Sequence, residues 1–139
     1  MTGERWTVKG VFSLLTTLAI VGPVLEEFAP ELVLVSAGYD AHERDPLASM
    51  RVTTRGYAAM IRSIRDAVAR HAQIALVTEG GYELTALAAC IEASLLVLDG
   101  AEPGPVSARD AGLPPGAPAR GERAVATTRA ALKPYWRAI

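Results

Sequence analysis

Two short apolar runs constrain the fold of this 139-residue chain more than any other feature. Residues 32–35 (LVLV) and 74–77 (IALV) are uninterrupted stretches of aliphatic residues. Such stretches are typical of strands in parallel sheets, where helices cover both faces. We therefore expect two buried strands, over residues 32–36 and 74–79.

Amphipathic helices are expected on either side of these strands. Apolar residues recur at helical spacing over residues 11–28, 53–71 and 84–98. Pro23 is expected to kink the first helix or to open a new first turn. Helices that alternate with strands predict an α/β fold built on a parallel sheet. Two strands are too few for such a sheet, because buried strands need neighbours at their edges. Either further strands escape detection or the chain is part of a larger α/β domain.

The composition changes after residue 99. Residues 100–121 contain five prolines and five glycines and keep no hydrophobic periodicity. This pattern predicts a linker or an ordered surface excursion. Residues 122–139 are expected to form a closing helix with Trp136 as its packing anchor. The chain thus divides into an α/β segment over residues 1–99, the excursion over 100–121 and the last helix.

Charge and cysteine content exclude several classes of protein. Fourteen basic and fifteen acidic residues give a formal charge of −1, so we expect no direct binding of nucleic acid. The single cysteine, Cys90, excludes an internal disulfide. Two histidines and one cysteine are too few for a structural zinc site of the Cys/His kind. A reducing, cytoplasmic setting is the expectation.

The apolar stretch over residues 11–25 raises the question of a membrane segment. It is shorter than the roughly 20 residues of a spanning helix, and Pro23 interrupts it. Arg5 and Lys9 precede it, as basic residues precede the core of a signal peptide, but no clear cleavage site follows. We favour a helix of a soluble domain and expect no association with a membrane.

Polar loops follow both expected strands, over residues 36–52 and 79–82. If a right-handed crossover helix joins two adjacent parallel strands, the loops meet at the same edge of the sheet. That edge would then gather five chemically active side chains: Asp40, His42, Asp45, Glu79 and Tyr82.

These residue types predict one kind of chemistry. Carboxylates with an imidazole are typical ligands in zinc or iron(II) hydrolases, which keep one position open for water. The Tyr82 phenol would donate a hydrogen bond to an oxyanion formed on an attacked carbonyl. Gly80 and Gly81 would give the backbone freedom and leave clearance for a ligand. Solvated acidic turns with a glycine pair are the alternative interpretation.

The loop sequences also resemble a known family. SAGYDAHERDPL at residues 36–47, followed by LVTEGGY at 76–82, resembles the C-terminal part of histone deacetylases. The likeness is closer to the bacterial and class II branch, which includes acetoin-utilisation proteins and acetylpolyamine amidohydrolases. PVLEEFAPELVLV at residues 23–35 resembles the preceding helix and strand of the family, so that the resemblance covers about residues 11–98. It implies the C-terminal portion of a three-layer, arginase/deacetylase-type domain with an eight-stranded parallel sheet.

The resemblance implies roles for individual residues. Asp45, before Pro46, matches the third ligand of the catalytic Zn²⁺, for which Fe²⁺ is the alternative. Tyr82 matches the catalytic tyrosine that polarises the acetyl carbonyl and stabilises the oxyanion. The other motif residues match supporting positions: Asp40 and His42 in the scaffold of the ligand loop, and Glu79, Gly80 and Gly81 along the acyl-lysine channel.

Two departures from the family pattern limit the expected activity. The family takes its other two zinc ligands from an earlier Asp-x-His motif and its general base from a His-His pair, and this chain has neither upstream of Asp45. Asp40-Ala41-His42 spells Asp-x-His but lies within the third-ligand motif itself. We therefore expect a segment of a zinc-dependent hydrolase of acetyl-lysine or acetylpolyamine amides that is incomplete alone. It would self-associate or pair with an N-terminal half. The alternative is a non-catalytic remnant or interaction module.

Structural roles compete with functional ones at several positions. Asp45 could cap a turn before proline, and Tyr82 could pack beneath the third helix. His42 is expected to be a loop residue bonded to backbone, and His71 to end the helical stripe of its own helix. The remaining candidates are expected to be packing residues: Tyr39, Tyr57 and Cys90.

Overall fold

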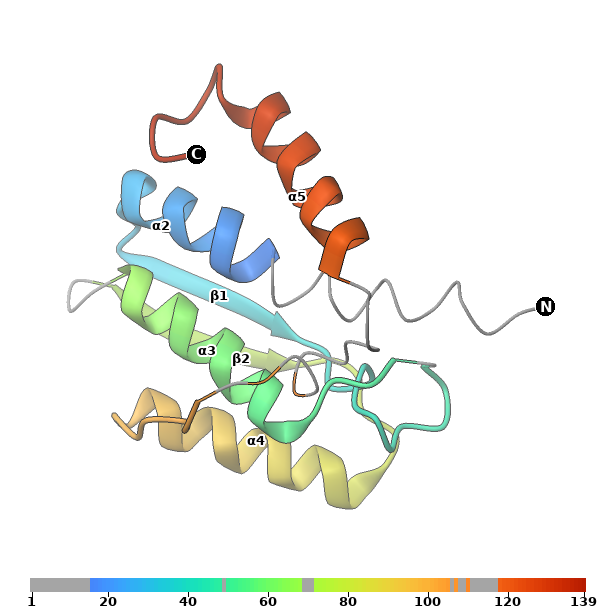
Figure 1. Cartoon of the computed structure of the whole chain (residues 1–139). Helices are drawn as coiled ribbons and strands as arrows, with labels where there is room; N and C mark the ends of the chain where they lie inside the picture. The colour runs from blue at the N-terminus through green and yellow to red at the C-terminus, as the bar shows by residue number, and fades with distance from the viewer. Residues whose placement is uncertain (1–15, 49, 69–71, 106, 108–109, 111–117) are drawn as a thin grey trace.

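The computed structural model describes residues 16–48, 50–68, 72–105, 107, 110 and 118–139. Its elements alternate in the expected order, which confirms the α/β class (Figure 1). Their bounds are η1 Thr17–Val21, α2 Gly22–Phe28, β1 Leu32–Ala37, α3 Thr54–Val68, β2 Gln73–Thr78, α4 Leu84–Leu98 and α5 Pro118–Leu132.

The strands β1 and β2 are parallel neighbours. Leu32 lies opposite Gln73 at one end of the pair, and Ala37 lies opposite Thr78 at the other. The helix α3 connects the two strands, as parallel pairing requires. Both loops that follow the strands therefore begin at the same edge of the sheet.

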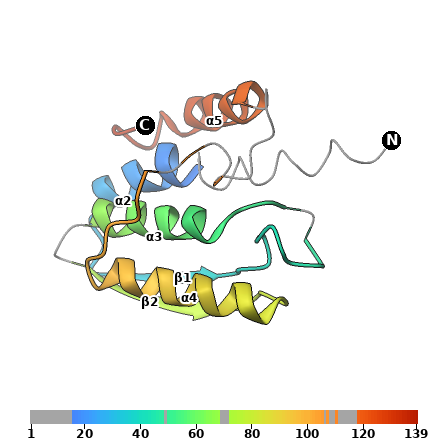
Figure 2. The ribbon, with the colours of Figure 1, turned by 60° about the horizontal axis from the view of Figure 1, so that its bottom comes forward.

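Three helices form a layer on one face of this sheet. Figure 2 shows α2 and α3 on the same side of β1 and β2, and α4 packs against α3. Ala58 and Ile61 of α3 pack with Val97 of α4, over the inward-facing side chains of Val35 and Leu76. A second cluster lies nearer the loops and contains Ala37, Tyr39, Val52, Tyr57 and Cys90. Packing roles for the two tyrosines and Cys90 are thus confirmed.

The other face of the sheet corrects one expectation. We predicted strands covered on both faces, but Leu32, Leu34 and Val77 are 56%, 68% and 54% exposed. Successive strand residues point to opposite faces, so the helix layer covers only alternate side chains. Within the described residues no second layer covers the outward set, and the continuous apolar runs overstate the burial.

The first helical region is divided at Gly22. The π-helix η1 precedes the α-helix α2, and Pro23 lies in the first turn of α2. This arrangement agrees with the second of the two roles expected for Pro23, since a first-turn proline lacks only an N–H that would be unpaired anyway. Residues 11–15 of the expected helix, and His71 beyond α3, lie outside the described residues.

The last helix is displaced from its expected bounds. It runs over Pro118–Leu132, whereas we predicted 122–139. The sequence does not predict its first turn, because that turn begins at a proline and contains Gly121. Ile20, Val125 and Ile139 form a cluster here, and Trp136 packs against it and lies 6.5 Å from the ring of Phe28. No helix of the described residues is long and apolar enough to span a bilayer.

Candidate functional site at the ends of β1 and β2

The loops that follow β1 and β2 are bonded to each other through their backbones. The Tyr39 N–H donates to the Gly80 carbonyl oxygen at 2.8 Å, and the Glu79 N–H donates to the Ala37 oxygen at 3.2 Å. These bonds extend the strand pairing past the last strand residues. The structure thus brings the Asp40 loop and the Tyr82 loop to one rim.

Asp45 joins the two loops through its carboxylate. Oδ2 accepts the Tyr82 N–H at 2.7 Å, and Oδ1 accepts the Leu47 N–H at 2.9 Å. The residue is buried. Burial alone would raise the pKa of this carboxyl group, but the backbone N–H donors, led by that of Tyr82, outweigh it and lower the pKa. Asp45 is therefore an ionised cross-link between the loops.

Asp40 has a different environment. Its carboxylate lies against Gly38 and Gly80: a Cβ on Gly80 would be 3.1 Å from Asp40 Cγ, and one on Gly38 would be 3.2 Å from Oδ1. No hydrogen bond within the described part of the chain engages this half-buried carboxylate. Two glycines therefore make room for this carboxylate.

Tyr82 is fixed by its backbone, and the residue is 57% exposed. The preceding Gly81 has φ +133°, a conformation that favours glycine. A Cβ at Gly81 would also be 2.8 Å from Cδ1 of Leu87 in α4. The sequence EGGY thus folds into a turn that holds the Tyr82 main chain and leaves its phenol accessible.

Glu83 and Arg44 add a second connection that the sequence alone did not reveal. The Glu83 carboxylate caps α4 by accepting the N–H groups of Thr85 and Ala86, at 3.3 and 2.7 Å. It also pairs with Arg44 Nη2 at 2.6 Å. The Ala86 N–H is the main reason that the pKa of Glu83 is lowered. A glutamate directly before a helical stripe was the available signal.

His42 is a buried loop residue rather than an open ligand. Its Nδ1 accepts the Arg44 N–H at 3.2 Å, so the ring proton of the neutral form is on Nε2. Nε2 lies 3.2 Å from Thr54 Oγ1. Burial lowers the pKa of the imidazole, which favours this neutral form. Both nitrogens are thus engaged in holding the ligand loop against α3.

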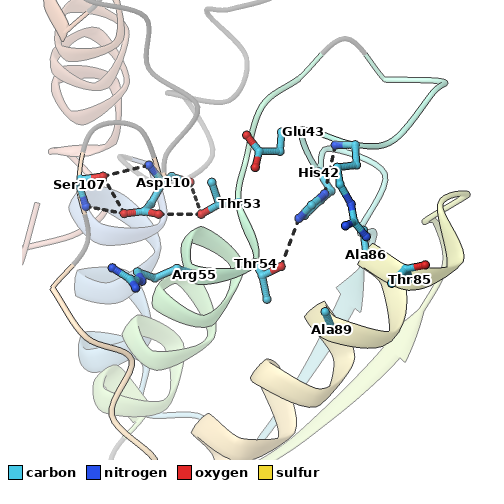
Figure 3. Close-up of a pocket in the computed structure, with 11 residues that line it drawn as sticks. His42, Glu43, Thr53, Thr54, Arg55, Thr85, Ala86, Ala89, Ser107 and Asp110 are labelled. Atoms are coloured by element: carbon cyan, nitrogen blue, oxygen red, sulfur yellow. Dashed lines mark hydrogen bonds between the residues drawn. The ribbon is translucent and has the colours of Figure 1, made fainter.

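A separate pocket of about 530 Å³ lies between the starts of α3 and α4 (Figure 3). Asp110 borders it and binds Thr53, whose N–H and hydroxyl donate to the Asp110 carbonyl and carboxylate at 3.1 and 2.9 Å. The pocket lining does not include Asp40, Asp45 or Tyr82. Sequence reasoning missed it, because Asp110 lies 57 residues from Thr53 in the chain.

The motifs imply a metal site at this rim. Within the described residues no group of three or more His, Cys, Asp or Glu side chains is placed to hold a metal ion. A catalytic zinc site takes three protein ligands. The Asp45 carboxylate, or that of Asp40, could supply one of them, so the described residues do not fit a complete zinc site.

The fold and this rim define a class of protein: an α/β domain whose parallel strands carry chemically active loops at their carboxyl ends. Residues 11–98 match the family described as the histone deacetylase domain, and the chain belongs to that family. The family is typically zinc-dependent.

Similar proteins include bacterial, archaeal and plant members. The chain is 46% identical over 65 residues to the histone deacetylase-like amidohydrolase of Pseudomonas aeruginosa, covering 45% of this chain and 17% of that protein. It is 40% identical over 67 residues to a probable deacetylase of Archaeoglobus fulgidus, covering 47% and 19%. Against histone deacetylase 18 of Arabidopsis thaliana the identity is 40% over 80 residues, covering 55% and 11%. The chain thus spans less than a fifth of each relative.

Solved structures give the same result for the fold. The HDA15 HD domain superposes on 92% of this chain with a TM-score of 0.70 and 26% identity, but only 32% of that domain is used. The histone deacetylase Clr3 superposes on 93% with a TM-score of 0.75 and 26% identity, using 20% of its chain. The two-stranded unit therefore corresponds to a fraction of a histone deacetylase domain.

Proposed function

We propose that this chain is the C-terminal segment of a zinc-dependent amidohydrolase that removes acetyl groups from amines. The observation that carries the proposal is the rim itself. The exposed Tyr82 and the carboxylates of Asp40 and Asp45 come from loops that are bonded to each other. Family membership over residues 11–98 supports the same assignment.

Tyr82 is the proposed catalytic residue. Its hydroxyl would donate a hydrogen bond to the carbonyl oxygen of the acetyl-amide, and this bond strengthens as the oxygen becomes an oxyanion. The Asp45 bond to the Tyr82 N–H holds the main chain in place. Gly80, Gly81 and Glu79 would border the channel for the acylated amine. The substrate is an acetyl-lysine or an acetylpolyamine.

One carboxylate of the ligand loop is proposed to bind the metal ion. The sequence motif led us to expect Asp45, with Asp40 in the scaffold of the loop, and this assignment stays a prediction. Each oxygen of Asp45 accepts a backbone N–H bond, which orients the carboxylate. Asp40 is the alternative, since its carboxylate lies against two glycines and accepts no such bond within the described residues. A zinc ligand needs accessible oxygen lone pairs, so a comparison of the two asparagine variants decides between them.

The remaining ligands and the general base must come from polypeptide outside this chain. The chain carries no His-His pair and no Asp-x-His motif upstream of its ligand loop. One carboxylate and one phenol cannot activate a water molecule. We accordingly propose catalysis only in an assembly with an N-terminal deacetylase portion, in the cytoplasm.

Turnover of an acetyl-lysine reporter tests the function. The full chain is co-refolded with the part of the Pseudomonas aeruginosa relative that precedes its match to this chain, and Zn²⁺ is added. We expect hydrolysis that falls about 100-fold or more in Tyr82→Phe, as for loss of an oxyanion donor. Of Asp45→Asn and Asp40→Asn, the variant of the metal ligand should be inactive, and the other should retain partial activity. Hydrolysis that survives Tyr82→Phe and both of these variants would overturn the proposal.

A non-catalytic interaction module is the second candidate. The finding in its favour is that no three metal-ligating side chains converge among the described residues. This alternative predicts assembly with a partner but neither bound zinc nor turnover in any combination of variants.

A further inference from the structure

Two successive residues of the Asp40 loop hold two successive residues of the Tyr82 loop. Asp45 accepts the Tyr82 N–H through Oδ2 at 2.7 Å. Arg44, the residue before Asp45, donates from Nη2 to Glu83 Oε2 at 2.6 Å. A single contact would let one loop pivot on the other, whereas two contacts at neighbouring positions also set its orientation. The Arg44–Glu83 pair is therefore placed to fix the direction in which the Tyr82 loop points.

The Tyr82 loop needs such a second fixed point because of its glycine. Gly81 has φ +133° and, without a side chain, leaves the backbone before Tyr82 wide conformational freedom. Glu83 follows Tyr82 with extended backbone (φ −97°, ψ 103°) and begins α4, where its carboxylate accepts the N–H groups of Thr85 and Ala86. Tyr82 thus lies between a permissive glycine and a residue anchored to a helix.

Arg44 is itself held in place by the turn that contains it. Its N–H donates to His42 Nδ1 at 3.2 Å, and the Asp45 N–H donates to the His42 carbonyl oxygen at 2.9 Å. His42 is buried, and its Nε2 lies 3.2 Å from Thr54 Oγ1 at the start of α3. A continuous series of contacts therefore runs from α3 through His42 and Arg44 to Glu83 at the start of α4.

The ion pair is better suited to orientation than to stability. The side chains of Arg44 and Glu83 are 52% and 31% exposed, and water screens pairs of this kind so that they add little to the free energy of folding. Without Arg44, Glu83 still accepts its two N–H bonds from α4. The start of α4 does not depend on the pair, and what the pair adds is the placement of one loop against the other.

We propose that Arg44 is a positioning residue that acts through Glu83 on Tyr82. The inference rests on the proposed function. The Tyr82 hydroxyl stabilises an oxyanion only where it meets the position at which the negative charge develops. A displaced hydroxyl loses an interaction that is strongest in the transition state, so loss of Arg44 would lower kcat and leave KM nearly unchanged. An arginine that bound the substrate directly would raise KM instead.

Steady-state kinetics of the assembly described above test this role. Arg44→Ala should lower kcat about tenfold and change KM by less than about twofold. Arg44→Lys should recover part of the loss, because an ammonium group can still pair with Glu83. Arg62→Ala is the matched control: Arg62 is a partly exposed arginine of α3 with ion pairs of its own, to Asp66 at 3.2 Å and Glu102 at 2.9 Å. It should leave kcat unchanged.

Ionic strength gives a readout that a purely structural role would not move. Raising the salt concentration from about 0.1 M to 1 M shortens the screening length from about 10 Å to about 3 Å and weakens an exposed ion pair. The kcat of the unaltered chain should fall toward that of Arg44→Ala, while the variant responds much less. An equal response of both proteins would contradict the role of Arg44.

Amide exchange in the full chain alone separates the two proposals. In Arg44→Ala the Tyr82 N–H should exchange about threefold faster or more, while the Ala86 N–H, still bonded to Glu83, keeps its rate. Turnover with an unaltered kcat in Arg44→Ala, or with a change in KM only, overturns the positioning role and leaves the proposed function standing. Absence of turnover in every assembly overturns the proposed function; faster Tyr82 exchange then still supports the hold of Arg44 on this loop, and unaltered exchange overturns it.

Discussion

Asp45 illustrates how one side chain can join the two loops of a site. Its two oxygens bind the main chain of both loops, at Tyr82 and at Leu47. The motif singled it out from the sequence, but its hydrogen-bond partners depend on pairing between strands that lie 41 residues apart in the sequence. Sequence could thus predict that Asp45 matters, and only the fold distinguishes its environment from that of Asp40.

The first prediction concerns acid stability. The pKa of Asp45 in the folded chain is lowered below its ordinary value of 3.8, so the unfolded chain binds the proton more readily. The stability it contributes is present above about pH 3.8 and is lost as the pH falls through the lowered folded value. Urea midpoints measured from pH 7 to pH 2 should fall less steeply in Asp45→Asn over this acid range. Equal slopes in both proteins would contradict the assignment.

The second prediction compares two buried tyrosines. The Tyr57 hydroxyl has no hydrogen-bond partner within the described residues, although the Ala41 N–H lies close enough to influence its pKa. The Tyr39 hydroxyl donates to Ser94 Oγ at 3.1 Å. Because an unpaired buried hydroxyl is costly, Tyr57→Phe should raise the free energy of unfolding by about 1 kcal/mol, and Tyr39→Phe should lower it by about 1 kcal/mol. Urea denaturation checks both, and shifts of the same sign would refute the contrast.

The helix α3 depends on a contact with a residue that is far away in the sequence. Its start is held by Asp110, which accepts the Thr53 N–H and hydroxyl. Gly56 permits this approach, since a Cβ there would collide with the Asp110 carbonyl oxygen and lie 2.9 Å from Val52 Cγ1. The excursion expected over residues 100–121 is therefore ordered at Asp110 and bonded to the first turn of α3.

The third prediction follows from this contact. Gly56→Ala should lower the free energy of unfolding by about 1 kcal/mol net, because the clash outweighs the better helix propensity of alanine. Gly104→Ala is the matched control, since a Cβ there has nothing within 4 Å. It should change stability by less than about 0.5 kcal/mol. Thermal unfolding of the three proteins provides the measurement, and a stabilised Gly56→Ala would contradict the contact.

Secondary structure was predictable where the sequence signal is local. The apolar runs located β1 and β2 to within one residue at each end, and periodicity located α3 and α4. The start of α5 was missed because Pro118 and Gly121 resemble a loop. The Glu83 cap and the Asp110 contact were missed because they join segments that only the folded chain brings together.

The architecture as a whole explains why two strands looked too few from the sequence. The described chain is a sheet with one helical layer, an uncovered apolar face and two open edges. Along each strand, less and more exposed side chains alternate, which a continuous apolar run in the sequence does not show. The more exposed side chains mark the face on which no second layer lies in the described part of the chain. The same incompleteness extends to chemistry, because a phenol and a carboxylate are present without the other groups of a hydrolase site.

Everything proposed for the molecule depends on the two loops sharing one rim, and amide hydrogen exchange at Tyr82 tests this most directly. In the unaltered chain the Tyr82 N–H should exchange on the order of tenfold or more slowly than in an unstructured peptide, because Asp45 accepts it. Asp45→Ala should abolish that protection while the Leu87 N–H, bonded to the carbonyl oxygen of Glu83 at the start of α4, stays protected. Exchange at the unstructured rate in the unaltered chain, or protection that survives Asp45→Ala, would contradict the account.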